Sequence, residues 1–179
     1  NNFTVMGLAG TTNYTLSISN NALYIALMAA DPNLYVGSNS SGQLTNFTSG
    51  TNGYSNTYVG YNTGDSNNVL TIANTNTLLL NTNDLYVGYS GSSNSMVISN
   101  GGAVSDSNGW IGYSNTASNN TVLVTESGSV WSNSGSLTIG ESGSGNSLVI
   151  SNGGTLVDYT GVIGDGTGSS GSVTVTNGR

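Results

Sequence analysis

The sequence predicts an all-β protein, folded as a single-stranded parallel β-solenoid (β-helix) with about three short strands in each coil. Pairs of apolar or aromatic residues followed by glycine recur along the chain, and short runs of alternating apolar and polar residues lie between them. Clusters of Gly, Asn and Ser after these runs favour sharp turns. Self-similarity at a fixed period is typical of stacked repeat proteins.

The repeated phrase ends in glycine at seven positions: Gly7, Gly37, Gly60, Gly88, Gly112, Gly140 and Gly164. Successive glycines lie 30, 23, 28, 24, 28 and 24 residues apart, and every second glycine lies 51 to 53 residues further on. The spacing therefore predicts coils of 23–30 residues that form double repeats of about 52 residues. We expect these glycines to turn the chain at the corners of the coils.

The repeats fill the chain, so we expect one continuous solenoid over residues 1–179. The units are residues 7–59, 60–111 and 112–163, with a partial unit at 164–179. The chain begins within an expected strand over residues 3–6 and stops just after another over residues 173–176. We expect it to be a segment of a longer or polymerising chain.

Alternation within the runs predicts strands. Leu70 and Ile72 fall on one face of a strand, as do Met96 and Ile98, with polar or outward residues between them. The only helix-like run, residues 23–30, aligns with residues 77–82 of the next unit and is interpreted as a strand plus a loop. A propeller fits the 52-residue length but not the two phrases in each unit, and a β-sandwich predicts no repeat.

Composition limits the classes of partner. Charged residues make up 5% of the chain, the net charge is −7, and Arg179 is the single basic residue. A surface that binds nucleic acid needs Lys and Arg, and so does attraction to anionic membranes. No apolar run reaches the roughly 20 residues of a membrane-spanning helix. Disorder is the competing interpretation, but apolar residues are 35% of the chain and recur in register with the glycines.

Catalysis, cofactors and metals are not expected. The best carboxyl pair is Glu141 and Asp165, which follow equivalent glycines in adjacent coils and are expected to stack about 5 Å apart. The chain has no Cys and no His for a soft metal site. Gly164-Asp165-Gly166 is only a fragment of the calcium-binding nonapeptide. We interpret the pair as solvated corner residues and predict no enzyme.

A candidate surface aromatic ladder is predicted at Tyr61, Tyr89 and Tyr113, which directly follow repeat glycines. Equivalent positions line up in a solenoid, so the three rings should stack along one outer edge. Two interpretations stay open at this point. The ladder binds glycans through exposed rings, or the rings stabilise one another by about 0.5–1.5 kcal/mol per pair.

The second half of the chain carries a recognisable order of motifs. Asn133-Ser134-Gly135-Ser136-Leu137-Thr138-Ile139-Gly140 is followed by Ser147-Leu148-Val149-Ile150-Ser151-Asn152-Gly153-Gly154-Thr155-Leu156, then by Val162-Ile163-Gly164 and Gly171-Ser172-Val173-Thr174-Val175. This order resembles the type V secretion/PEP-CTERM-associated repeat of autotransporter passengers and exported bacterial surface proteins. The resemblance covers residues 60–179 well and the first unit loosely, and residues 38–57 depart most.

The resemblance implies a right-handed β-helix on the bacterial cell surface or outside the cell, used as a stalk or filament, with no catalytic residues. The function we expect is a structural module that assembles end to end with itself or continues a longer chain. The alternative is an adhesin that presents the aromatic ladder to surface glycans.

Overall fold

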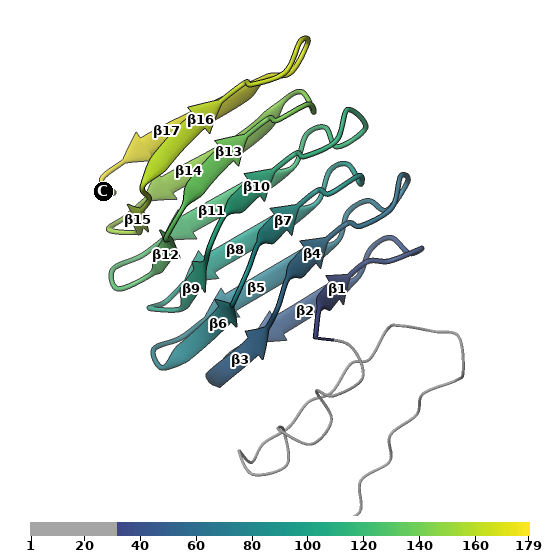
Figure 1. Cartoon of the computed structure of the whole chain (residues 1–179). Coiled ribbons are helices and arrows are strands. Elements are labelled where there is room, and N and C mark those ends of the chain that lie inside the picture. The colour runs from purple at the N-terminus through teal and green to yellow at the C-terminus, as the bar shows by residue number, and fades with distance from the viewer. Residues whose placement is uncertain (1–31) are drawn as a thin grey trace, which may run out of the picture.

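A computed structural model describes residues 32–179, which form strands β1 to β17 and no helix. The strands hold three to six residues each. Gly7, the expected strand at 3–6 and the run at 23–30 lie outside the described residues. The predicted all-β parallel solenoid is confirmed, and Figure 1 shows its coils stacked along one axis.

Three parallel sheets run the length of the solenoid. Sheet A consists of β1 (Leu34–Val36), β4 (Thr57–Val59), β7 (Leu85–Val87), β10 (Gly109–Ile111), β13 (Ser136–Ile139) and β16 (Thr160–Ile163). Sheet B consists of β2 (Leu44–Phe47), β5 (Val69–Ala73), β8 (Ser95–Ser99), β11 (Thr121–Thr125), β14 (Asn146–Ser151) and β17 (Gly171–Thr176). Sheet C consists of β3 (Gly50–Tyr54), β6 (Thr77–Asn81), β9 (Ala103–Asp106), β12 (Val130–Asn133) and β15 (Thr155–Val157).

Each strand pairs with its equivalent one coil along. Leu70 of β5 pairs with Met96 of β8, and Met96 pairs in turn with Val122 of β11. Neighbouring coils are therefore about 4.8 Å apart, and a side chain has the same position of the next coil above it. This register turns a pattern in the sequence into a column of side chains along the axis.

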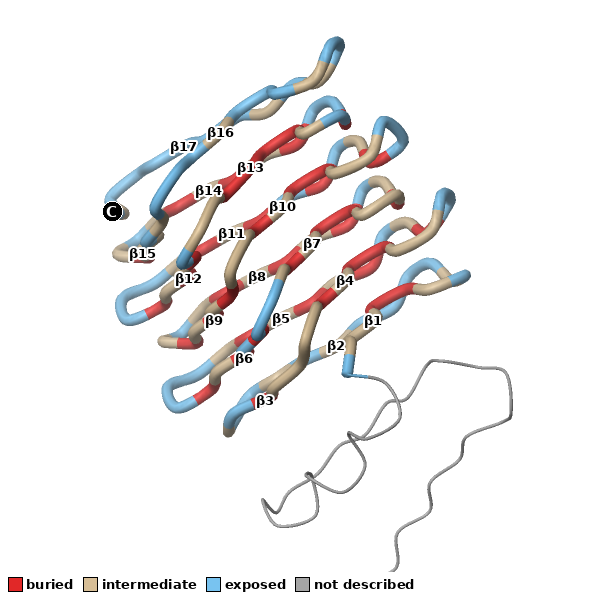
Figure 2. The backbone as a smooth tube through the Cα atoms, viewed as in Figure 1, coloured by how far each residue is buried: buried red, intermediate tan, exposed pale blue. Residues whose placement is uncertain are grey.

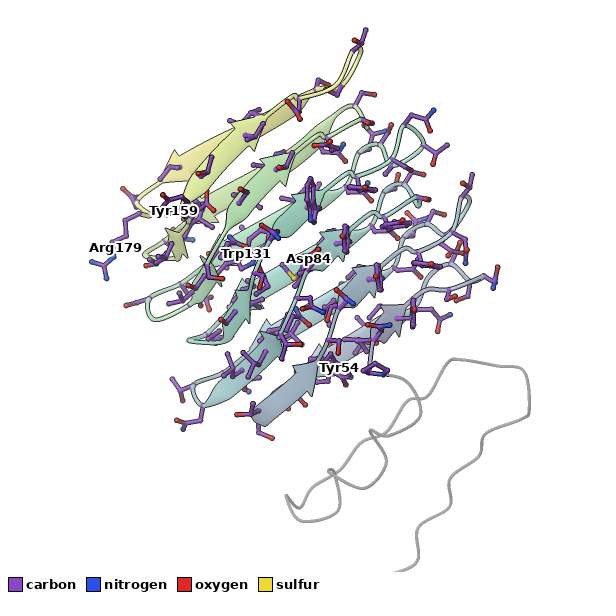
Figure 3. The ribbon with its side chains drawn as sticks, viewed as in Figure 1. Tyr54, Asp84, Trp131, Tyr159 and Arg179 are labelled. Atoms are coloured by element: carbon purple, nitrogen blue, oxygen red, sulfur yellow. The ribbon has the colours of Figure 1, made fainter. Side chains whose placement is uncertain are left out.

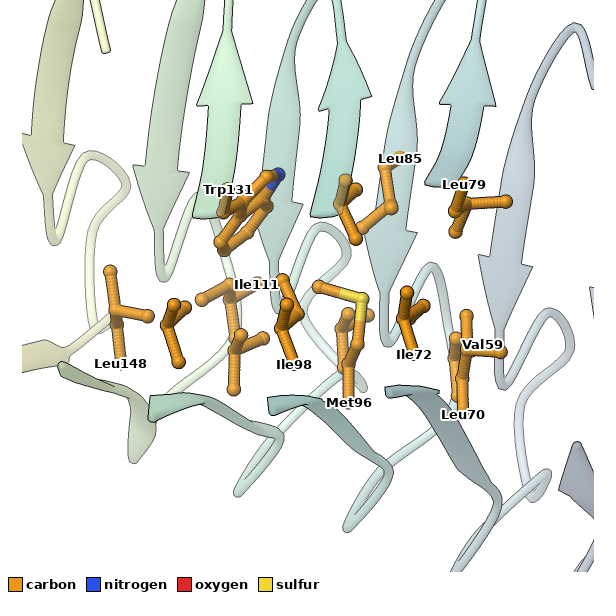
Figure 4. Packing of buried hydrophobic residues seen from close by; sticks show 14 of the residues in the cluster. Val59, Leu70, Ile72, Leu79, Leu85, Met96, Ile98, Ile111, Trp131 and Leu148 are labelled. Atoms are coloured by element: carbon orange, nitrogen blue, oxygen red, sulfur yellow. The ribbon is translucent and has the colours of Figure 1, made fainter. Parts of the chain in front are cut away.

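The core fills the centre of the coils because the alternating runs turn one face of every strand inward. In β5 the buried positions are Leu70 and Ile72, and their neighbours are only half-buried. Figure 4 shows these side chains in rows with Met96 and Ile98, while Figure 2 shows burial repeating at the same place in the coils before β16. Trp131 of β12 is the largest fully buried side chain. Burying a Leu, Ile or Met side chain of this core contributes about 1.5–3 kcal/mol.

The coil formed by β16 and β17 differs from those before it. Ile163, Val173 and Val175 pair with Ile139, Leu148 and Ile150 of the preceding coil. Those three partners are at most 3% exposed, whereas Val173 is 37% exposed and Val175 54%. No described coil covers this face of the core, which Figure 2 shows as exposed along β16 and β17.

Candidate functional site

Seven aromatic side chains form one half-buried surface, which we call the aromatic ridge. The ridge consists of two stacked rows of rings, or ladders. The first ladder runs along sheet A and contains Tyr35, Tyr58, Tyr86 and Trp110. The second runs along the turns that follow sheet A and contains Tyr61, Tyr89 and Tyr113. The tyrosines predicted as a ladder do stack, with ring centroids 5.2 Å apart between Tyr61 and Tyr89 and 5.1 Å between Tyr89 and Tyr113.

The two ladders also pack against each other. Tyr86 meets Tyr89 edge to face at 5.2 Å and Tyr113 at 5.5 Å, while it stacks on Tyr58 at 5.1 Å. Aromatic pairs prefer these offset-stacked and T-shaped arrangements. The ring faces therefore lie against other rings, and the ridge presents mainly ring edges and hydroxyl groups.

Packing in the ridge changes the acidity of its phenols. Burial raises the pKa of Tyr58 to about 12, with smaller contributions from Tyr35, Tyr61 and Tyr89 and from the Asp84 carboxylate. Burial also raises the pKa of Tyr86, and Asp84 adds to the effect because the Tyr86 hydroxyl donates a hydrogen bond to Asp84 Oδ2 at 3.1 Å. Both phenols stay neutral at physiological pH and act as hydrogen-bond donors rather than as bases.

The ridge stops at the coil of β10. Trp110 pairs with Thr138 in the next strand, and the turn after β13 carries Glu141 where the preceding turn carries Tyr113. Glu141 and Asp165 lie together, as predicted. The pKa of Glu141 is raised by burial first and then by the charge and hydrogen bonding of Asp165. Asp165 is exposed and Glu141 half-buried, so the pair lies at the surface of the corner.

The corner glycines lie against a ladder of buried asparagines, which sequence reasoning missed. Gly37, Gly60, Gly88 and Gly112 have φ between 78° and 82°, the left-handed region that favours glycine. A methyl group on any of them would overlap a buried asparagine amide of the next coil. Gly140 and Gly164 also have positive φ, but no asparagine amide lies beside them. The corner glycines thus supply both the turn and the space for the amides.

We call the buried amides the asparagine ladder: Asn68, Asn94, Asn120 and Asn146, each at most 1% exposed. Asn94 Nδ2 donates to Asn120 Oδ1 at 3.1 Å, and the Asn94 backbone N–H donates to the same oxygen at 2.9 Å. Asn120 Nδ2 donates to Asn146 Oδ1 and to the Gly91 carbonyl at 3.1 and 3.2 Å. Buried amides that are fully hydrogen-bonded hold the chain in one arrangement, whereas a partly bonded one is costly.

The ladder explains why the glycine spacing alternates. Its asparagines are 26 residues apart at every step, whereas the glycines from Gly60 to Gly164 are alternately 28 and 24 apart. Between glycine and asparagine there are 7 residues after Gly60 and Gly112 but 5 after Gly88 and Gly140. Measured from asparagine to asparagine, every coil therefore has the same length, and the 52-residue unit arises because the turns after the glycines have two lengths. The constant 26-residue spacing is the sequence signal for the asparagine ladder, and the abundance of asparagine in the chain hides it.

Asp65 joins the first two described coils and is only 3% exposed. Its carboxylate accepts hydrogen bonds from the backbone N–H groups of Asn39, Ser40 and Asn62, at 3.2, 2.8 and 2.7 Å. Three backbone donors on one carboxylate fix both turns. This role was not predicted, because nothing in the sequence separates Asp65 from the surface carboxylates.

Replacing Asp65 by alanine is therefore expected to lower the free energy of unfolding by about 2 kcal/mol, since buried N–H groups lose a charged acceptor. Urea unfolding measures the loss, and amide hydrogen exchange should accelerate at Asn39 and Ser40. The control is Asp165→Ala at an exposed corner, which should change the stability by less than about 0.5 kcal/mol. Equal losses in the two variants would contradict the tethering role.

Within residues 32–179, no group of three or more acidic, His or Cys side chains is arranged to hold a metal ion. No helix in that part of the chain is long and apolar enough to cross a membrane.

No family model, curated protein or solved structure matches this chain. The parallel solenoid is established by its strand register.

Proposed function

We propose that this chain is a structural, non-catalytic module of an extracellular or bacterial cell-surface protein. It acts as a stalk or filament-forming subunit that extends by stacking coil on coil, onto a second copy or onto further coils of a longer chain. The observation that carries the proposal is the uncovered core at the coil of β16 and β17. There Ile163 is 53% exposed, against 2% for its partner Ile139.

The form of this end supports addition of another coil. β15, β16 and β17 are the last strands of their sheets. β16 and β17 each have one edge that pairs with no described strand, whereas the outer edge of β15 is bonded to the backbone of Arg179, which accepts from the Leu156 N–H at 2.8 Å and donates to the Gly154 carbonyl at 3.0 Å. Such edges recruit further strands unless charges or prolines block them. Val157 and Tyr159 are 52% and 85% exposed beside these edges, and Figure 3 shows Tyr159 at this end of the solenoid.

The motif order of residues 60–179 supports the location. Its resemblance to the type V secretion/PEP-CTERM-associated repeat favours an exported protein, and the low charge and dense backbone ladders suit a rigid surface rod. In this proposal the aromatic ridge stabilises the coils, because its ring faces are already packed against one another.

The test is association of the purified chain with rising concentration, followed by sedimentation velocity and negative-stain electron microscopy. Val175→Lys places a charge on the uncovered end and should abolish association, as lysine does on natural edge strands. Thr121→Lys adds the same charge on the exposed face of β11, in the middle of the solenoid, and should leave association intact. A chain that stays monomeric at every concentration would overturn the filament role.

The competing adhesin role has its own readout. Replacing Tyr61, Tyr89 and Tyr113 by serine should lower stability without changing retention on immobilised glycans. Retention by the unmodified chain that disappears in this variant while the fold survives would instead establish a glycan-binding ridge.

A further inference from the structure

A second buried polar column lies where the strands of sheet C end. Asn81, Asp106 and Asn133 are the last residues of β6, β9 and β12, and each is at most 4% exposed. Asp106 and Asn133 are register partners, and extending the neighbouring registers by one residue adds Asn81 before them and Asp158 after them. Four polar side chains thus follow one another through consecutive coils.

Unlike the asparagine ladder, this column leaves buried atoms without partners. They are Asn81 Nδ2, Asp106 Oδ1, Asn133 Oδ1, Asn133 Nδ2 and Asp158 Oδ1. Thr57 Oγ1 donates to Asn81 Oδ1 at 2.7 Å, so the column has a donor at its first member. An unpaired polar atom in the interior costs about 1–3 kcal/mol, and five together require an explanation.

Asp106 is the unusual member. Its Oδ2 accepts the indole N–H of the buried Trp131 at 2.7 Å, and its Oδ1 accepts nothing. The only basic side chain of the protein, Arg179, lies exposed and donates to Thr155 Oγ1. The titratable groups that act on Asp106 are two further carboxyls, Asp84 in the turn after β6 and Asp158 after β15.

These surroundings disfavour a charged carboxylate. Burial raises the pKa of Asp106 to about 7; the Trp131 hydrogen bond lowers it, and Asp84 and Asp158 raise it further. Asp84 is itself well solvated by hydrogen bonds, since it accepts from Asn108 Nδ2 at 2.9 Å as well as from Tyr86. Asp106 has no comparable set of donors.

One proton removes the conflict between two neighbouring acceptors of the column. Asp106 and Asn133 are register partners, and Asp106 Oδ1 and Asn133 Oδ1 are buried acceptors without a partner in consecutive coils. A hydrogen on Asp106 Oδ1 supplies the donor that this pair lacks.

We propose that Asp106 is a neutral carboxylic acid in the folded protein and that its O–H donates to Asn133 Oδ1, joining β9 to β12 inside the core. Ionisation releases this proton to solvent and leaves two buried acceptor oxygens in consecutive coils with no donor between them. The Asp106–Asn133 pair is therefore a pH-sensitive element inside the rod, whose hydrogen bond forms in acid and is lost as the pH rises.

The sign of the effect follows from proton linkage. An unfolded aspartate ionises near pH 4. Below that pH both states hold the proton, so the stabilisation is complete. Between about pH 4 and 7 only the folded state holds it, so the unfolding equilibrium constant rises about tenfold per pH unit. Above about pH 7 both states are ionised and the stabilisation is lost.

The test compares the chain with its Asp106→Asn variant in urea at pH values from 4 to 9. Asparagine keeps an acceptor for Trp131 and an N–H₂ donor for Asn133 at every pH. The ratio of the wild-type to the variant unfolding constant should rise about tenfold per pH unit up to about pH 7 and then stay level. Asp84→Asn, which removes a neighbouring and fully bonded carboxyl, should keep the wild-type slope.

A direct measurement covers the case in which a variant fails to fold. The ¹³Cγ resonance of Asp106 in the wild-type chain should report a protonated carboxyl at pH 5.5. An ionised carboxylate at that pH would overturn the proposal, because it would mean that amide or water donors satisfy Oδ1. A ratio of unfolding constants that does not change with pH would overturn it too.

Discussion

Replacing Asn120 by alanine is expected to lower the free energy of unfolding by about 4 kcal/mol. The substitution leaves the Asn94 backbone N–H and the Gly91 carbonyl without the partners that the amide provides. Each buried group so orphaned costs about 1–3 kcal/mol, and the space left by the amide adds to the loss. Urea unfolding followed by circular dichroism measures the change.

The matched control is Asn115→Ala, in the exposed turn of the same coil. It removes an identical side chain from solvent and should change the stability by less than about 0.5 kcal/mol. If the two variants unfold at the same urea concentration, the asparagine ladder does not hold the coils together.

Replacing Gly88 by alanine is expected to have an effect of similar size, about 4 kcal/mol. Its φ of 80° costs a non-glycine residue about 1 kcal/mol, and the added methyl group would displace the Asn120 amide. Gly64→Ala separates the two causes. Gly64 has a φ of 93° and open space around its α-carbon, so only the backbone strain of about 1 kcal/mol should remain.

A double-mutant cycle gives the sharper measurement. Once Asn120 is alanine, the methyl group at position 88 has no amide to meet, so adding Gly88→Ala should cost only about as much as Gly64→Ala. Additive losses would mean that the glycine is required for its turn alone.

The sequence predicted the coil because its signal is periodic. The glycine phrases and the alternating runs predicted the strands, the parallel stacking and the stack of Tyr61, Tyr89 and Tyr113. Residues 38–57 depart from the motif order, yet β2 and β3 pair with β5 and β6. Backbone hydrogen bonds between neighbouring coils do not depend on side-chain identity, so this coil forms without the motif.

The interior polar groups were beyond such reasoning. Asn120 is the third residue of a polar run that starts at Ser118, and only its place beside Gly88 separates it from its exposed neighbours. Asp106 occupies a column position held by Asn81 and Asn133 in adjacent coils, and its burial follows from which face of β9 turns inward. Both depend on contacts between coils, which the spacing of glycines along the chain does not describe.

The asparagine ladder also bears on how the rod would respond to tension. A force pulling along the axis acts in full on every boundary between two coils, because the boundaries follow one another in series. Within one boundary, the hydrogen bonds between the two coils share that force. From Gln43 to Asn146, each boundary between coils has hydrogen bonds to an asparagine side chain in addition to the backbone hydrogen bonds. At the first of these boundaries the Gln43 backbone N–H donates to Asn68 Oδ1, and at the others the asparagine ladder itself forms the bonds. At the last boundary the partner of Asn146 is Gly171, which has no side-chain amide. A steady pull would therefore detach the coil of β16 and β17 first and leave the remaining coils intact.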